Sequence, residues 1–163
     1  MANPEHLEKI HLGSQKWNAW REENPEIVPD LERAELVGMI ARRINLEGAN
    51  LRHANLRSAD LREANLKRAN LYRAHLQGTD LVRANLQSAI LDRAVLDKTL
   101  LGAADFTDAT FLGTFLIDLI FAYTCLKNAN LRGARLFRVD FTTALLDNTT
   151  FPDGTLHDVT NIE

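Results

Sequence analysis

The sequence predicts an all-β solenoid, in which the chain winds into stacked coils around an apolar column. Leucine or phenylalanine occupies every fifth position from Leu46 to Leu156. A small residue, mostly alanine, lies two positions before most of them, and asparagine or aspartate often lies between the two. Charged residues also recur at a spacing of twenty, with alternating sign. Such a repeat indicates a solenoid, because each unit can bury its apolar side chain only against its neighbours.

A period of five residues matches neither an α-helix nor a flat strand. In a helix, successive members of the series would be rotated by about 140° and would spread over all faces. In a strand, an odd spacing would place alternate members on opposite sides of the sheet. With the apolar residue called i, we predict an extended piece with i−2 and i inward and i−1 outward. A corner at i+1 and i+2 then turns the chain.

The spacing of the charges favours four sides to each coil. At a stacking distance of twenty residues, Lys98, Asp118 and Arg138 fall in one column with alternating charge. At fifteen residues, Arg68, Arg83 and Lys98 would bring like charges together. Single surface ion pairs contribute little, so this alternation is supporting evidence. With about 4.8 Å between coils, the sequence predicts about six coils and a rod about 30 Å long.

The A(N/D)LXX pattern resembles that of the pentapeptide repeat family and covers about three quarters of the chain. The stretch WNAWREENPEIVPDLERAEL, from Trp17 to Leu36, is similar to the segment that precedes such arrays in many bacterial, often cyanobacterial, members. The resemblance implies a right-handed quadrilateral β-helix. It implies no single function, because solenoids of this fold serve unrelated roles.

Both ends of a solenoid need a cover, because an open β-edge and an uncovered column recruit other chains. Residues 1–30 are interpreted as a capping helix and linker, residues 31–156 as the repeat rod, and residues 157–163 as a C-terminal capping tail. One helix is expected over residues 4–22, with Asn3 as its cap and Pro4 in its first position. The sequence FPDGTL indicates a turn, after which the chain from Leu156 to Glu163 is expected to fold over the other end.

Composition indicates one soluble globular domain, with 45% hydrophobic and 25% charged residues among 163. Cys125 is the only cysteine, so we expect no internal disulfide and a cytoplasmic location. No stretch resembles a signal peptide or approaches the about 20 apolar residues of a membrane span, so a membrane partner is not expected. Residues 42–98 contain eleven Lys/Arg and six Asp/Glu. This modest, interleaved basic excess makes nucleic acid an unlikely partner.

The residues that carry catalysis or bind cofactors and metals do not form a recognisable constellation. His6 and His11 share the expected helix but lack a ligand-rich context. Cys125 occupies an outward i−1 position, and no histidine falls at the same or an adjacent position one coil away. It is interpreted as a free structural thiol. The expectation is a protein that is not an enzyme and that uses no cofactor or metal.

Apolar residues replace polar ones at several outward positions, and twenty-residue stacking gathers them on neighbouring sides. The predicted interaction residues are Val95, Leu100, Phe115, Ile117, Ile120 and Tyr123. A large exposed apolar patch usually marks an interface, so we expect a homodimer seam or a docking site for a protein partner. The alternative is a capping segment or loop that covers these residues. Leu119, a large residue at a small position, would overfill the column, so a bulge there is the alternative to a regular coil.

The sequence thus predicts a non-catalytic, rigid protein-interaction module or scaffold. The alternative is the activity of some family members that mimic the DNA duplex and bind type II topoisomerases such as gyrase. That role requires a strongly acidic rod, whereas the middle of this chain is basic. A third possibility is nucleic-acid binding by the Arg-rich faces around Arg52, Arg57, Arg62, Arg73 and Arg93.

Overall fold

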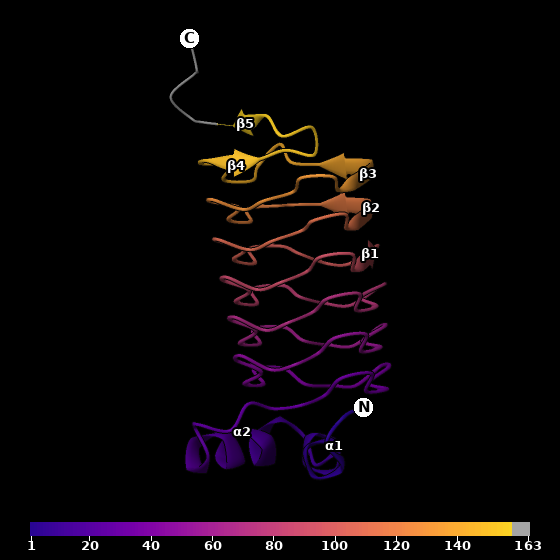
Figure 1. The fold of residues 1–163 in the computed structure, drawn as a ribbon, viewed down its shortest axis with the longest axis vertical. Helices are drawn as coiled ribbons and strands as arrows, with labels where there is room; N and C mark the ends of the chain where they lie inside the picture. Colours follow the sequence, from indigo (N-terminus) through magenta and orange to yellow (C-terminus); the bar gives the residue numbers. More distant parts are fainter. Residues whose placement is uncertain (158–163) are drawn as a thin grey trace.

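The computed structural model describes residues 1–157, which form a four-sided rod with a pair of helices at its N-terminal end (Figure 1). The helices are α1 (Pro4–His11) and α2 (Ser14–Glu23). The strands are β1 (Val95–Asp97), β2 (Phe115–Ile120), β3 (Arg135–Asp140), β4 (Thr149–Thr150) and β5 (Leu156–His157). No described helix combines the length and the apolar character that crossing a bilayer demands.

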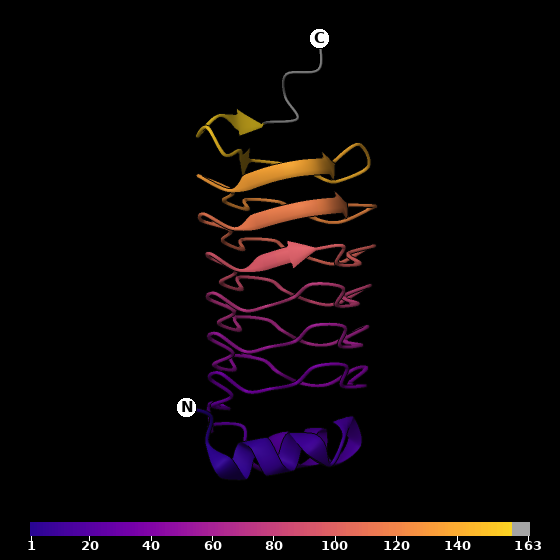
Figure 2. The ribbon, with the colours of Figure 1, turned by 90° about the vertical axis from the view of Figure 1, so that its right-hand side faces the viewer.

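Every coil contains twenty residues. Strands β1, β2 and β3 form a parallel sheet in which Val95 pairs with Phe115 and Phe115 with Arg135, and Figure 2 shows them stacked along the rod. Single bridges on the other sides keep the same offset, as between Asp60 and Asp80. The predicted stacking of residues twenty apart is therefore confirmed.

Backbone hydrogen bonds join each coil to the next and close each corner. The amides at positions i and i+2 donate to carbonyls of the following coil, the amide at i−1 donates to the preceding coil, and the amide at i−2 closes the turn. For the repeat at Leu51 these bonds are Leu51 N to Asn70 O (2.8 Å), His53 N to Tyr72 O (2.9 Å), Asn50 N to Pro29 O (2.8 Å) and Ala49 N to Leu46 O (3.0 Å).

The asparagine or aspartate at i−1 accounts for the remaining amide. Its side-chain oxygen accepts a hydrogen bond from the amide at i+1, as Asn65 does from Lys67 (3.2 Å) and Asn85 from Gln87 (3.0 Å). Such a bond contributes about 1 kcal/mol and satisfies a donor that the coil leaves free. The i−1 side chain is thus a structural cap of the corner as well as an outward residue.

The second corner residue adopts the left-handed conformation at every corner from Arg33 to Asn148 except at Thr143. Among residues 1–157, eighteen non-glycine residues have φ between +50° and +60°, and all of them occupy position i+2. This conformation costs about 1 kcal/mol for a residue with a Cβ. The cost is offset by the bond that the same amide makes to the next coil, as Arg33 N does to Arg52 O (2.8 Å).

The apolar column runs along the axis of the rod. Leucines of the five-residue series from Leu31 to Leu131, such as Leu61 and Leu81, are buried. The predicted inward position is wrong for Leu136, which is 38% exposed in β3. Near the C-terminal end the column becomes aromatic, with 5.2 Å between the ring centroids of Phe106 and Phe111. Threonine at i−2 is accommodated because its hydroxyl donates to a carbonyl of the preceding coil, as Thr79 Oγ1 does to Leu56 O (2.7 Å).

The single helix predicted over residues 4–22 is wrong, because Gly13 breaks it. Gly13 has φ of +90°, which ends α1 and lets α2 begin at Ser14. The expected cap is confirmed, since Asn3 Oδ1 accepts a hydrogen bond from Glu5 N (2.9 Å). Both helices contact the first coil: the His6 ring accepts from Asp30 N (2.9 Å) and Trp17 Nε1 donates to Asn45 O (2.7 Å).

Two further expectations concern the C-terminal part of the rod. Leu119 forces no bulge, because it is buried and pairs with Val139 at the regular offset of twenty. Leu156 follows the five-residue register, but its predicted inward position is wrong, since it is 58% exposed. The chain reverses at the turn before it, so that β5 pairs with β4 in antiparallel fashion. Of the predicted tail, residues 158–163 lie outside the described residues.

Candidate interaction surface

The six predicted interaction residues, here called the apolar patch, lie on two neighbouring sides of the rod and the corners beside them. Val95 and Phe115 pair within the sheet, and Ile117 occupies the corner that follows in β2. Leu100 and Ile120 lie on the next side, where they are 55% and 63% exposed. Tyr123, at the following corner, is 76% exposed. Val95, Phe115 and Ile117 are half-buried.

A hollow of about 360 Å³ lies between Leu100 and Ile120. Its lining also includes Val82, Gly102 and Ala122, which stack at the first corner position of three successive coils. These three residues are not among the predicted interaction residues. Their signal is a column of small uncharged residues at a corner position that elsewhere carries charge, as at Arg42 and Arg62. Lys98 and Asp118 also line the hollow, so the patch is a concave, mainly apolar surface on this side with charged residues at its corner.

The corner between the two sides forms a ridge. Phe137 stacks on Ile117 and is 56% exposed, so it extends the patch by one coil. The guanidinium of Arg138 lies 4.4 Å from the centroid of the Phe137 ring and also bonds to the carboxylate of Asp118. That hydrogen bond holds the pKa of Asp118 below its ordinary value. The predicted alternation of charge is confirmed here and at the Arg43–Glu63 pair (2.9 Å).

The outward apolar residues cannot form the hydrogen bond with the i+1 amide that asparagine or aspartate forms in other repeats. Leu100 and Ile120 occupy position i−1, where asparagine or aspartate binds the i+1 amide in other repeats. An apolar side chain has no acceptor atom for that amide. It also remains exposed, so burial in the monomer does not offset the lost bond. The patch is thus costly for the isolated rod.

The other candidate residues show no comparable grouping. Cys125 is half-buried, with its Sγ 3.2 Å from Thr107 Oγ1. Within residues 1–157, no three His, Cys, Asp or Glu side chains converge as metal ligands would.

The family follows from the repeat itself. Residues 30–68, 64–102 and 101–136 match the model of pentapeptide repeats, in eight copies. The chain belongs to the pentapeptide repeat family. Pentapeptide repeat proteins fold as right-handed quadrilateral β-helices and are generally non-enzymatic structural or interaction proteins. The match indicates no catalytic family.

Solved structures of other pentapeptide repeat proteins are similar to this one. A trypsin-treated form of QnrB1, a plasmid-mediated fluoroquinolone resistance protein, is 15% identical with a TM-score of 0.57, over 75% of this chain and 67% of the other. HetL, involved in heterocyst differentiation in the cyanobacterium Nostoc, is 29% identical with a TM-score of 0.37, over 78% of this chain and 70% of its own. Rfr23 from the cyanobacterium Cyanothece is 24% identical with a TM-score of 0.23, over 86% and 97%. A comparison with curated proteins finds no match.

Proposed function

We propose that this pentapeptide repeat protein is a non-catalytic interaction module that docks a protein through the apolar patch. The observation that carries the proposal is the exposure of Leu100 and Ile120 around a hollow, at positions where the repeat otherwise places a capping amide or carboxylate. Exposed concave apolar surface is typical of protein docking sites. The occupant is a partner protein or a second copy of this chain, in the cytoplasm.

The proposal assigns a separate role to each part of the chain. Residues 31–156 are a right-handed rod of about six coils that presents side chains in steps of about 4.8 Å. Residues 1–30 cover one end of the rod. A rod of this kind presents a docking surface that is already ordered before the partner arrives, which lowers the entropic cost of binding.

The test replaces Ile120 by the residue type that the repeat normally has. Ile120→Asn supplies an acceptor for the Ala122 amide, so the variant is expected to fold, while it removes the centre of the patch. Ile40→Asn is the matched control, because Ile40 occupies the same position on the same side and is 76% exposed, yet lies outside the patch. Analytical ultracentrifugation measures self-association, and a pull-down followed by mass spectrometry measures partner capture.

We expect Ile120→Asn to lose the dimer or the captured partner and Ile40→Asn to keep it. A wild-type monomer that captures the same proteins as Ile120→Asn would contradict the proposal.

The charge of the described surface favours this function over gyrase binding by DNA mimicry. Asp60 and Asp80 form an acidic column, but Arg62 pairs with both, at 2.7 Å and 3.2 Å, and Arg42 pairs with Asp60 at 2.7 Å. DNA mimicry needs carboxylates that present net negative charge to the partner. A gyrase supercoiling assay tests the alternative. We expect no inhibition of gyrase and no protection from fluoroquinolones. Either effect at a low micromolar concentration of this protein would favour gyrase binding over the proposed docking function.

A further inference from the structure

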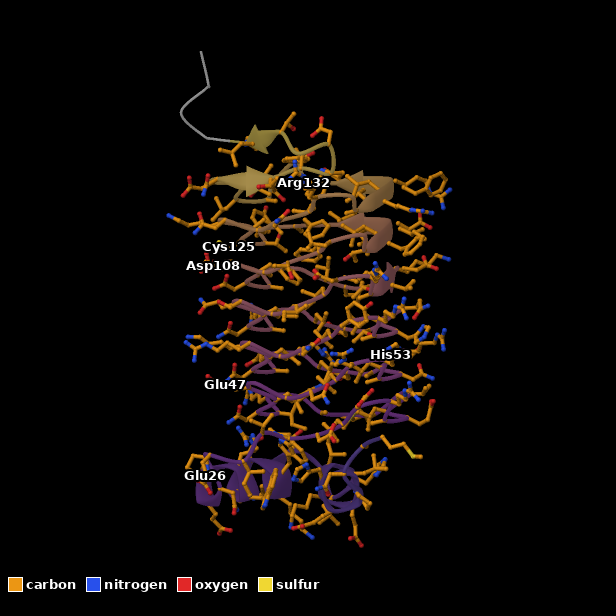
Figure 3. The ribbon with its side chains drawn as sticks, viewed as in Figure 1. Glu26, Glu47, His53, Asp108, Cys125 and Arg132 are labelled. Carbon is orange, nitrogen blue, oxygen red and sulfur yellow. The ribbon has the colours of Figure 1, made fainter. Side chains whose placement is uncertain are left out.

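A second groove, of about 550 Å³, lies beside the apolar patch on the side formed by β1, β2 and β3. Val95 and Phe115 form its apolar floor. Its walls carry Arg73, Arg93 and Arg135, together with two histidines. Figure 3 shows one of these, His53, across the rod from the edge that carries Glu47 and Asp108. None of the lining residues is acidic.

The groove exists because two stacked corner residues have no side chain. The i+2 column on this corner runs through Arg73 and Arg93 and then through Gly113 and Gly133. A Cβ on Gly113 would meet Arg93 Cγ at 3.7 Å, and a Cβ on Gly133 would meet Gly113 N at 3.9 Å, so a side chain would fit at either position. Arg93 itself shows that the conformation does not require glycine, since its φ is +59°. The hollow therefore follows from these two glycines.

The three arginines of the groove contact aromatic side chains and, within the described part of the chain, do not pair with carboxylates. Arg93 Nη1 donates to the Tyr72 hydroxyl (3.4 Å), and the Arg73 guanidinium lies 5.3 Å from the centroid of the same ring. Arg135 lies over the Phe115 ring at 5.1 Å. Among residues 1–157, no carboxylate oxygen comes within 4.0 Å of these three guanidinium groups, whereas Arg42, Arg43, Arg62 and Arg138 are all paired.

We propose that this groove binds an extended acidic segment of the partner protein, with an apolar side chain placed on Val95 and Phe115. The inference rests on the proposed function, because Val95 and Phe115 belong to both surfaces. Guanidinium groups bind carboxylates through paired, directional hydrogen bonds. The groove spans four coil steps, from the level of His53 to that of Gly133, or about 19 Å at about 4.8 Å per coil, which fits about six extended residues at about 3.3 Å each.

The floor of the groove favours a peptide over a nucleic acid. Binding of single-stranded nucleic acid without sequence preference usually relies on aromatic rings with free faces, on which bases stack. Here Arg135 already covers a face of Phe115, and Val95 offers no stacking surface. An aliphatic side chain between carboxylates matches both the floor and the walls.

The test measures the fluorescence anisotropy of a labelled six-residue peptide in which glutamate and leucine alternate. Arg93→Glu and Arg135→Glu are each expected to weaken binding about tenfold, because an attraction becomes a repulsion. Arg83→Glu is the matched control, since Arg83 has the same repeat position and the same φ of +59° at a different corner. It is expected to change binding by less than about twofold, as for a screened surface charge. Gly133→Asn, which fills the hollow without changing charge, is expected to weaken binding as well.

The inference would be overturned by the absence of peptide binding to the wild type or by equal losses in Arg83→Glu and Arg93→Glu. Equal binding of a peptide with lysine in place of glutamate, or tighter binding of a six-nucleotide oligothymidylate, would also overturn it. The Ile120→Asn variant separates this inference from the proposed function, because Ile120 lies outside the groove. Peptide binding that survives Ile120→Asn supports the groove whatever that variant does to docking. Docking that is lost in Ile120→Asn while the peptide fails to bind the wild type rejects the groove alone.

Discussion

At the scale of single residues, the corner cap explains the composition of the repeat better than exposure does. Asparagine and aspartate at i−1 are partly outward, but their oxygens bind an amide that the coil leaves free, as Asn65 does for Lys67. The sequence alone shows that these residues alternate with leucine and alanine, and it does not show which atom they bind. The structure shows this partner, because the i+1 amide lies within hydrogen-bond distance of the i−1 side-chain oxygen.

Removing one cap should therefore destabilise the rod by a measurable amount. We expect Asn65→Ala to lower the free energy of unfolding by about 1–2 kcal/mol, because the Lys67 amide loses its acceptor. Leu100→Asn should do the opposite and raise it by up to about 1 kcal/mol, by supplying an acceptor for the Gly102 amide. Urea unfolding followed by circular dichroism measures both. An unchanged free energy of unfolding in Asn65→Ala, or a decrease in Leu100→Asn, would contradict this role of the cap.

The ion pairs predict how stability depends on pH. Arg62 and Arg42 hold the pKa of Asp60 far below its ordinary value by hydrogen bonding, and Arg138 lowers the pKa of Asp118 in the same way. Because these pKa values are lower in the folded protein, the stabilisation is complete above the unfolded value of about 4. It is lost as the pH falls from there toward the folded values.

Burial and the nearby Arg57 also hold the pKa of His75 below its ordinary value, so protonation of this imidazole opposes folding. We accordingly expect the urea midpoint to fall as the pH drops below about 6.5, because of His75, and to fall again below about pH 4, because of the carboxylates. Asp118→Asn should flatten part of this second fall. A midpoint that rises on acidification, or a slope that Asp118→Asn leaves unchanged, would contradict the assignment of these pairs.

At the scale of elements, the sequence pattern predicted the repeated coil, but it did not predict the break between the two helices or the chain reversal before Leu156. The extended pieces and the twenty-residue offset follow from the repeat, because every turn has the same hydrogen bonds. The helix boundary did not follow, since apolar positions continue from Ile10 to Trp17 across Gly13 and gave no sign of a break. Leu156 kept the leucine register, although the turn before it had already reversed the chain.

Gly13 should be more sensitive to substitution than a corner glycine. Gly13 has φ of +90° with nothing within 4 Å of an added Cβ, so Gly13→Ala tests the backbone alone and should cost about 1 kcal/mol or more. Gly48→Asn is the control, because φ of +66° at a corner is close to that of Asn128 and Asn148. We expect a change of less than about 0.5 kcal/mol there. Equal changes in the free energy of unfolding for the two variants would contradict the claim that the backbone conformation at Gly13 requires glycine.

At the scale of the whole molecule, a regular coil stacks residues twenty positions apart, so a few substitutions at one repeat position form a continuous surface feature. Each substitution at one position is placed beside those twenty residues away, so Leu100 and Ile120 become one hollow and Gly113 and Gly133 become one groove. The apolar patch could be predicted because twenty-residue stacking was applied to large side chains. The groove could not be predicted in this way, because it forms where Gly113 and Gly133 lack side chains, and the pattern of charged and apolar residues does not mark such positions.

The central claim is that the protein docks through the side of the rod that carries Leu100 and Ile120. Its most direct measurement is photo-crosslinking in the native cells, with a benzophenone amino acid placed at position 120 or, as the control, at position 40. We predict one discrete crosslinked species from position 120, either a dimer or a partner identified by mass spectrometry, and none from position 40. The same products from both positions, or none from position 120, would contradict the claim.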